Sequence, residues 1–388
     1  MYVSKVLKVL YSPRKTLKEV IQDPKYVGPL LIMILLIAAN VGSAYLVFSK
    51  VHDEQVLPNG TKLDEWTQNS TFWTSNALVT ESSDSITGTY YGNASMAFSI
   101  QNGTQVSMRL NGIGSINCSA PNGFSLLSFR IKWTDPVTKP EDVEIQMFSA
   151  NSSDYFYNNL TGTFANFIYN VWNNLTDASA IPLGAGWNST GPNVDWGNVT
   201  GLQMQFTWAG NSNITLLVDG LFFLGPYESR LETAGTTYLL SYGLMSGAMQ
   251  FVLTWIVLSG LIYIVVRAFG GKLVWRPVFI AVGFILITMF IGTLITAIGY
   301  STWPTIRIPF DLFGGVQGEG QAASKTISDQ TSLVYEVTTI AQYIMWLWTA
   351  VLASLITRLT AEFSWAKSVL VGALAYFITI LVVGFMVG

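Results

Sequence analysis

The chain has 388 residues, of which 50% are apolar and only 11% are charged, and its formal net charge is −3. About a quarter of the residues of an average soluble protein are charged, so this composition indicates an integral membrane protein. One Cys and one His exclude an intramolecular disulfide and leave no cluster of soft ligands for zinc, haem or iron–sulfur chemistry.

Residues 1–27 form a basic segment that precedes the first apolar run. Val3, Val6 and Leu10 have helical spacing, and Ser12-Pro13 is a helix-start signal before a second short apolar pattern. We expect short amphipathic helices at the cytoplasmic leaflet, with the lysines near anionic lipid head groups. A cleaved signal peptide is the alternative, but the basic part is long and no clear small-x-small cleavage site follows the apolar run.

Five apolar runs are long enough to cross a hydrocarbon core of about 30 Å. They span residues 28–48, 236–266, 277–300, 337–357 and 368–388. The second run is too long for one upright span, so part of it should tilt or protrude. None of the five contains Asp, Glu, Lys, Arg or His, which argues against proton-coupled transport because proton relays usually need such groups. The polar exceptions are Asn40, Gln250, Gln342 and hydroxyl residues.

The distribution of Lys and Arg predicts the orientation of the spans. Basic residues are concentrated in the N-terminal segment and in the short loops 267–276 and 358–367, whereas the Gly-rich, acidic loop 301–336 has only Arg307 and Lys325. Cytoplasmic loops carry an excess of Lys and Arg. We therefore expect a multi-pass protein of the cell membrane with a cytoplasmic N-terminus, and with the loop 301–336 and the C-terminus extracellular.

Residues 49–232 form a polar segment between the first two spans. The segment contains every Asn-x-Ser/Thr tripeptide of the chain, at Asn59, Asn69, Asn93, Asn102, Asn117, Asn151, Asn159, Asn174, Asn188, Asn198 and Asn213. Their confinement to one segment, together with its excess of acidic residues, predicts a glycosylated extracellular domain. A glycosylated exterior without disulfides favours an archaeal cell surface.

Within this segment the apolar period changes from helical to two. Apolar and polar residues alternate over residues 96–100, 106–110, 127–133, 143–147, 202–208 and 214–218. Such alternation is typical of antiparallel strands with one buried face, and Gly, Asn and Pro separate them. We therefore predict an α+β membrane protein with five transmembrane helices and an antiparallel two-sheet β-sandwich between the first and second helices.

The membrane part resembles the Yip family of five-span proteins, which are named for their interaction with Ypt/Rab GTPases. The resemblance is carried by Ser12-Pro13-Arg14-Lys15-Thr16-Leu17, by Gly28-Pro29-Leu30-Leu31 and by the stretch from Trp346-Leu347-Trp348 to Lys367. These loose patterns cover about 200 residues of the 388. Family members usually have a short connection where this chain inserts the polar segment, so the resemblance does not imply a trafficking role.

The polar segment is similar to jelly-roll modules of the galactose-binding or carbohydrate-binding type. The similarity is carried by residues 194–202, which read Val-Asp-Trp-Gly-Asn-Val-Thr-Gly-Leu, and by the closing strand 214–223. In that class the acidic residue of the closing strand often faces a structural calcium, which makes Asp219 a candidate metal ligand. The alternative is an Asp-Gly turn residue at a strand bend.

No catalytic constellation is evident, so we predict that the chain is not an enzyme and needs no cofactor other than that calcium. His52 has no nucleophile nearby, and Cys118 is interpreted as a small sandwich residue. Trp187 and Trp196 lie in Gly/Asn/Pro-rich loops and are candidates for stacking on sugar rings.

Small residues on the spans favour close helix packing, either within the chain or with a neighbour. They are Gly243, Gly247, Gly372 and Gly384. The favoured function is a scaffold, anchor or subunit of a cell-envelope assembly, with the bilayer and other membrane or cell-surface proteins as partners and no nucleic acid. A glycan-binding receptor is the first alternative, and a transporter or channel is the second.

Overall fold

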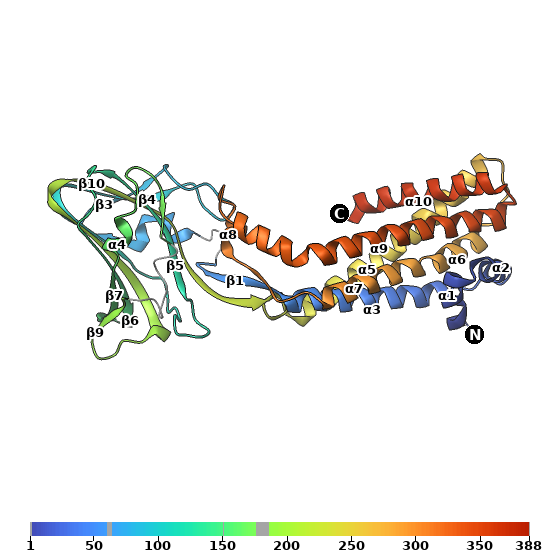
Figure 1. The fold of residues 1–388 in the computed structure, drawn as a ribbon, viewed down its shortest axis with the longest axis horizontal. Coiled ribbons are helices and arrows are strands. Elements are labelled where there is room, and N and C mark those ends of the chain that lie inside the picture. The colour runs from blue at the N-terminus through green and yellow to red at the C-terminus, as the bar shows by residue number, and fades with distance from the viewer. Residues whose placement is uncertain (1, 60–63, 150, 176–185, 388) are drawn as a thin grey trace. The chain divides into compact units, whose positions relative to one another are not determined.

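The computed structural model describes residues 2–59, 64–149, 151–175 and 186–387, and it is an α+β fold with a large antiparallel β-sheet and several long apolar helices (Figure 1). The chain divides into two compact units. The helical unit contains Met1–His52, Ser229–Ile306 and Ser328–Gly388. The sandwich unit contains Asp53–Glu228 and Arg307–Ile327.

Long apolar helices make up most of the helical unit. Its helices are α1 (Tyr2–Tyr11), α2 (Pro13–Gln22), α3 (Val27–Lys50), α5 (Arg230–Ala268), α6 (Trp275–Ile285), α7 (Ile287–Ser301), the larger part of α9 (Gln321–Ala361) and α10 (Trp365–Val387). Among the described residues, five helical stretches are long and apolar enough to cross a membrane when α6 and α7 are counted as one. They include the five runs that the sequence predicts, so apolar helices are confirmed at these positions.

The N-terminal segment forms the two amphipathic helices that its apolar spacing predicts. Pro13 occupies the first turn of α2, where its missing N–H costs no hydrogen bond. Val6, Val9, Leu17 and Val20 are buried and join the core of the helical unit. The basic residues therefore lie on the opposite, more exposed faces of α1 and α2.

Two of the predicted small residues let α5 approach α3 closely. A Cβ added at Gly243 would lie 2.7 Å from Val41 Cγ2, and one added at Gly247 would lie 3.1 Å from the Cα of Ile37. Close packing at these glycines is therefore internal to the chain. Gly372 packs closely against Ser354 of α9, because an added Cβ would clash with the backbone N of Ser354. A Cβ at Gly384 would have no atom within 4 Å.

Two helices begin earlier than the predicted spans. α5 begins at Arg230 with a capping box in which Ser229 Oγ accepts a hydrogen bond from the Glu232 N–H, and it is kinked at Gly235 by a φ of 77°. α9 begins at Gln321, so residues 321–336 are helical where the sequence predicts an extracellular loop. The helix extends this far because no Gly or Pro follows Gly320 until Gly372.

The sandwich unit is built mainly from strands. They are β1 (Val51–Leu57), β2 (Trp73–Ser75), β3 (Leu78–Ser82), β4 (Ser95–Leu110), β5 (Leu126–Asp135), β6 (Asp142–Ser149), β7 (Asn151–Asn159), β8 (Asn173–Asn174), β9 (Asn188–Thr190), β10 (Val199–Ser229) and β11 (Ile306–Ile308). Two short helices accompany them, α4 (Thr161–Phe164) and α8 (Phe310–Gly314).

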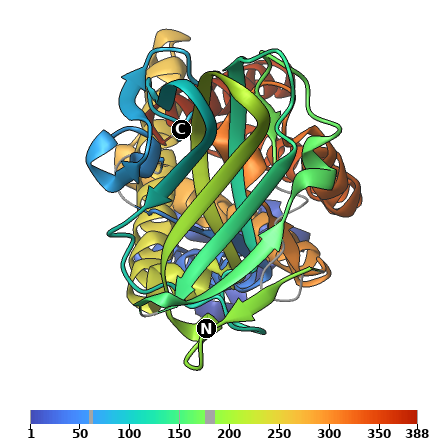
Figure 2. The same ribbon diagram turned by 90° about the vertical axis from the view of Figure 1, so that its left-hand side faces the viewer.

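The long strands β4 and β10 pair antiparallel through both layers of the sandwich. The first half of β10 has β6 on its other side and forms one layer in the order β2-β4-β10-β6-β7-β9, onto which Figure 2 looks. The second half has β5 on its other side and forms the other layer, β3-β4-β10-β5-β8. Register shifts between Thr207 and Ile214 mark the change of layer. Both layers contribute to one buried core, which confirms the predicted sandwich.

The structure differs from the sequence prediction in how these strands are divided. Residues 96–100 and 106–110 belong to the single strand β4, and residues 202–208 and 214–218 belong to the single strand β10. The Gly, Asn and Ser residues between the alternating patterns resemble turns in the sequence. In the fold they instead allow the paired strands to bend together, because a bulge adds residues without ending the ladder.

The segment 307–327, which lies between α7 and most of α9 in the chain, folds against the outer side of the β5 layer. Phe310 is 4% exposed and packs on Phe222 with ring centroids 4.6 Å apart. The Thr89 N–H donates to the carbonyl of Gly314 at 2.7 Å, and Glu319 forms an ion pair with the buried Arg130. Part of the predicted extracellular loop is therefore an integral part of the sandwich unit.

Phe310→Ala should loosen this segment, because removing a buried phenylalanine side chain costs about 3–5 kcal/mol. We expect a lower thermal midpoint and faster proteolytic cleavage within residues 307–327. Leu312→Ala is the matched control, since Leu312 lies on the same helix but is 36% exposed. Equal cleavage rates in the two variants would contradict the packing role of Phe310.

Candidate functional site

Polar side chains line the outer face of the β2-β4-β10-β6-β7-β9 layer of the sandwich unit. Strand register places one residue from each strand directly opposite the next, and this row crosses the whole layer. Its members are Thr74, Arg109, Gln203, Gln146, Tyr157 and Asn188. At about 4.8 Å between neighbouring strands, the row spans roughly 24 Å.

Alternation along each strand explains why these side chains share a face. Met108, Leu110, Leu202 and Met204 are buried in the core, so the residues between them, Arg109 among them, point outward. The alternating patterns at 106–110, 143–147 and 202–208 predict that polar residues line the outer face. They do not predict which residues are neighbours, because the register depends on long-range pairing.

Arg109 is the second residue of this row, between Thr74 and Gln203. Its guanidinium stacks over the ring of Phe148, with Cζ 4.1 Å from the ring centroid. Among the described residues, no hydrogen bond or ion pair uses this guanidinium, and its Nε is buried. A stacked, pre-oriented fork of unused donors is suited to binding pairs of hydroxyls or a carboxylate.

Aromatic rings from β6 and β7 form one side of the face. Phe148 packs edge-on against Tyr155 at 5.8 Å, and Tyr155 lies 6.2 Å from Tyr157. Both tyrosines are half-buried, and within the described chain neither hydroxyl makes a hydrogen bond. Rings that combine an apolar face with a free hydroxyl can stack on a sugar and bind its hydroxyls.

Glutamines from β6 and β10 fill the space between Arg109 and the tyrosines. Gln146 donates to the Glu144 carboxylate at 2.6 Å, which fixes both side chains. The amides of Gln203 and Gln205 form no hydrogen bond in the described part of the chain. Each amide offers two N–H donors and one carbonyl acceptor, so it can hydrogen-bond to two adjacent hydroxyls of a sugar ring.

The two tryptophans predicted to stack on sugars lie together, but against the core. Trp196 stacks face to face on Phe156 with centroids 3.7 Å apart, and Trp187 meets Trp196 edge-on at 5.3 Å. Both are half-buried and pack on the sandwich core. One face of Trp196 is thus covered, which favours a packing role over a flat platform. Sugar contact by Trp187 and Trp196 stays a prediction.

Asp219 is fully buried where β10 is bulged opposite β5. Its carboxylate accepts hydrogen bonds from the Ile86 N–H at 2.6 Å, the Gly220 N–H at 2.7 Å and the Thr67 hydroxyl at 3.3 Å. Gly220 has a φ of 56°, as expected for an Asp-Gly bend. Calcium needs six to eight oxygen ligands, whereas the three hydrogen bonds of this carboxylate come from donors, and the neighbouring charge is that of the buried Asp64.

Metal binding at Asp219 has no further support from the described residues, which contain no group of three His, Cys, Asp or Glu side chains spaced to hold an ion. Calcium at Asp219 stays a prediction. Cys118 is buried, as its interpretation as a small sandwich residue requires, and burial raises the pKa of its thiol to about 12. The described part of the chain therefore offers no reactive thiolate.

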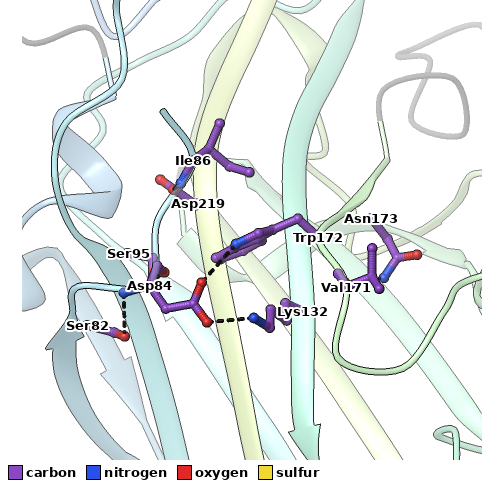
Figure 3. A network of polar contacts seen from close by, with 9 residues as sticks. All are labelled: Ser82, Asp84, Ile86, Ser95, Lys132, Val171, Trp172, Asn173 and Asp219. Carbon is purple, nitrogen blue, oxygen red and sulfur yellow. Dashed lines mark hydrogen bonds and ion pairs between the residues drawn. The ribbon is translucent and has the colours of Figure 1, made fainter. Parts of the chain in front are cut away.

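A second polar group lies outside β5, in the other layer (Figure 3). The Asp84 carboxylate accepts hydrogen bonds from Lys132 Nζ at 2.6 Å and from Trp172 Nε1 at 3.2 Å. The Asp84 N–H donates to Ser82, and the hydroxyl of Ser95 donates to the Asp84 carbonyl. Because these groups bind one another, the network fixes residues 82–86 over the strand.

The glycosylation candidates lie at the surface of the sandwich unit. All sequon asparagines are exposed except Asn198, which is half-buried. Asn159 and Asn188 lie on β7 and β9 at the edge of the polar face. Their exposure meets the steric requirement for modification.

Sequence reasoning did not single out Arg109, Phe148, Tyr155 or Tyr157. The alternating Tyr155-Phe156-Tyr157 triplet was a usable signal, since it presents two tyrosines on one face of a strand. Nothing in the sequence shows that Arg109, almost fifty residues away, joins them across β10 and β6. That neighbourhood depends on the order of the strands.

No protein-family model matches the chain, and no curated protein matches it. Similar solved structures include a family 11 carbohydrate-binding module from Clostridium thermocellum in complex with a β-1,3-1,4-mixed-linked tetrasaccharide, at 17% identity over 46% of this chain and 98% of that one, with a TM-score of 0.27. The family 11 module of the cellulosomal cellulase Lic26A-Cel5E from Clostridium thermocellum is 18% identical over 45% of this chain and 96% of that one, with a TM-score of 0.26.

Another similar structure is a carbohydrate-binding module of the β-sandwich superfamily, at 13% identity and a TM-score of 0.24. The match covers 40% of this chain and 57% of that chain. The neighbours are thus β-sandwiches of carbohydrate-binding modules. At such low identities and TM-scores, the likeness does not indicate what this chain binds. The Yip resemblance stays a prediction.

Asp219 should give the stability of the protein a measurable pH dependence. Burial raises its pKa from an ordinary value of about 3.9 to about 7. Between these values the folded protein holds a proton that the unfolded chain has lost. The stabilising contribution is therefore complete below about pH 4 and is lost as the pH rises through about 7.

We expect the thermal midpoint of the native protein to fall between pH 5 and pH 8, and Asp219→Asn to flatten this slope. The variant should also be less stable overall, because an amide nitrogen cannot accept the Ile86 hydrogen bond. Glu65→Gln is the control, since Glu65 is exposed. An unchanged slope in Asp219→Asn would show that other groups cause the pH dependence.

Proposed function

We propose that the chain is a non-enzymatic integral membrane protein that binds glycans on the outer face of its sandwich unit. The observation that carries the proposal is the row from Arg109 to Tyr157, in which a guanidinium without an acidic partner, two amides and a tyrosine lie in register across the layer. Sugars are recognised by this combination of paired polar groups and aromatic rings.

The shape of the row favours an extended ligand. Its length of roughly 24 Å exceeds a single sugar ring, so several residues of a glycan chain can lie across the strands. Arg109 lies second in the row, next to Gln203, where a hydroxyl pair or the carboxylate of an acidic sugar would meet it. The aromatic side chains of β6 and β7 then support the neighbouring rings.

The membrane topology is part of the same proposal. Five apolar helical stretches, the Lys/Arg-rich short loops and the exposed sequons support a multi-pass protein whose sandwich unit is extracellular and whose N-terminus is cytoplasmic. A glycan-binding face then meets the cell surface or the medium. A scaffold or anchor role in an envelope assembly, possible for the same molecule, stays a prediction, as does an archaeal source.

Binding should depend on Arg109 and Tyr157, which lie on either side of the two central glutamines of the row. Arg109→Gln and Tyr157→Ala should each weaken binding of a soluble polysaccharide by about tenfold or more, because a charge-assisted hydrogen bond or a stacked ring contributes about 1.5 kcal/mol or more. The measurement is affinity electrophoresis of the full-length protein in detergent, with neutral glucans, mannans and uronic-acid polymers in the gel.

Lys139→Gln is the control, since it removes a positive charge from an exposed loop outside the row. Tyr157→Phe should retain most of the stacking. Failure of the native protein to bind any polymer, or equal binding by Arg109→Gln and Lys139→Gln, would refute the proposal.

The topology predicts which lysines an impermeant amine reagent can reach in sealed cells. Lys139 should be labelled, because it is exposed on the sandwich unit, whereas Lys272 and Lys367 should be labelled only after permeabilisation. Peptide mass spectrometry gives the labelled sites and also any glycan mass on the sequons. Labelling of Lys272 in sealed cells would place the short loops outside and contradict the proposed orientation.

A further inference from the structure

The helical unit contains a cavity of about 850 Å³ whose lining comes from every apolar helical stretch. Each stretch contributes at least one polar residue, among them Asn40 of α3, Gln250 of α5, Thr288 of α7, Gln342 of α9 and Tyr376 of α10. The three amides that are isolated exceptions in the sequence therefore converge on one place. This volume lies within the range of about 300–1,000 Å³ that is usual for ligand sites.

Helical spacing on α9 explains much of this convergence. Tyr335, Thr338, Gln342, Trp346 and Thr349 recur at intervals of three or four residues and line the cavity together. The same helix places Leu347 and Val351 on another face, away from this lining. The polar stripe of α9 is therefore a continuous wall and not a set of scattered substitutions.

The inner end of the cavity is already hydrogen-bonded. The hydroxyls of Thr288 and Thr349 lie 2.7 Å apart, and Tyr376 hydrogen-bonds to Thr349. Thr288 and Thr349 are each 1% exposed, and Tyr376 is 6% exposed. These buried hydroxyls link α7, α9 and α10 and give the cavity a fixed polar floor.

The outer part contains polar groups without partners. Among the described residues, neither the Gln250 nor the Gln342 side chain forms a hydrogen bond, and both are exposed to the cavity. Asn40 donates to the carbonyl of Leu36 at 3.0 Å, which leaves its own amide oxygen available. In a hydrocarbon environment each unpartnered amide costs several kcal/mol, so water or a ligand must supply the missing partners.

The lining also defines the charge of an occupant. The described residues that form the cavity include no Asp, Glu, Lys, Arg or His, so neither an anion nor a cation would find a counter-charge. Amides and hydroxyls offer donors and acceptors side by side, as ligand hydroxyls do. Tyr335, Tyr343 and Trp346 add aromatic surface, with Tyr343 and Trp346 rings 5.6 Å apart. Sugars and polyols have this combination of neutral hydroxyls and C–H faces.

We propose that this cavity binds a neutral, hydroxyl-rich group, a sugar or polyol, within the membrane-spanning part of the protein. The group is either a free molecule or the head group of a neutral glycolipid. The site is independent of the polar face of the sandwich unit, because no residue is common to both. Gln250, Gln342 and Asn40 bind the hydroxyls, and the threonine and tyrosine floor sets the depth of entry.

The test uses the full-length protein in phosphatidylcholine nanodiscs, since sugar detergents would compete for the site. Three probes are added: trehalose, monoglucosyl diacylglycerol and the anionic lipid phosphatidylglycerol. Retained lipid is measured by native mass spectrometry, and trehalose binding by the fluorescence of Trp346 and its neighbours. Binding of trehalose or of the glycolipid, but not of phosphatidylglycerol, is the expected result, and the two arms separate a free sugar from a lipid head group.

Gln342→Leu and Thr349→Val should each reduce this binding about tenfold or more. Gln330→Leu is the matched control, because Gln330 lies on the same helix outside the cavity. Leucine is favourable in hydrocarbon, so Gln342→Leu should still fold. An unchanged thermal midpoint will show that it does. Arg109→Gln should leave cavity binding intact and so separates this site from the sandwich face.

Three outcomes would overturn the proposal. The first is the absence of binding by both trehalose and the glycolipid. The second is retention of phosphatidylglycerol at the same level as the glycolipid, because a cavity without charged groups should bind an anionic head group more weakly than a neutral one. Equal losses in Gln342→Leu and Gln330→Leu would likewise show that the bound molecule lies elsewhere on the helices.

Discussion

The antiparallel pairing of β4 with β10 is the interaction on which the sandwich unit depends. The two strands stay hydrogen-bonded from Leu110 and Leu202 at one end to Met96 and Val218 at the other, and they bend together between the layers. Strands β2, β3, β5 and β6 pair directly with β4 or β10, β7 and β8 pair with β6 and β5, and β9 follows on β7. The pair thus sets the register of the outer face, including the neighbouring positions of Arg109 and Gln203. Moving the register by one residue would exchange these side chains with core residues such as Met108.

If the helical unit spans a membrane as proposed, the corresponding constraint there is that backbone and side-chain polar groups must find partners away from water. Close contacts at Gly243 and Gly247 let α5 lie against α3 without a gap. The large cavity of the helical unit has a mixed polar and apolar lining, and the Thr288–Thr349 contact links two helices at its floor. A bundle that only anchored the sandwich unit could fill this space with leucine or isoleucine. The amides of the lining are therefore the reason for proposing a binding role there.

The sequence predicts the parts of this protein that depend on local pattern. Hydropathy locates the apolar helices, and alternation such as Leu127 to Trp133 locates the strands, because both signals lie within one element. The sequence pattern does not distinguish the bend of β10 at Asn211–Asn213 from a turn. It also does not show that residues 321–336 belong to a helix. The candidate site was harder to predict from the sequence than the fold. Trp187 and Trp196 stand out by residue type and composition, yet they pack on the core, whereas Arg109 and Tyr157 become neighbours only through strand order.

The two candidate sites use the same neutral groups and differ in charge. The sandwich face carries the Arg109 guanidinium beside glutamines, with the Glu144 carboxylate already hydrogen-bonded to Gln146, so an acidic or a neutral glycan could be accommodated there. In the cavity, glutamines, threonines and tyrosines are present without any charge, so the burial of an ionised group would be opposed by desolvation alone. A carboxylate or phosphate on the ligand is therefore the feature that should separate them. If both proposed sites bind sugars, the charge of the ligand, and not its size, is therefore the property by which they should differ.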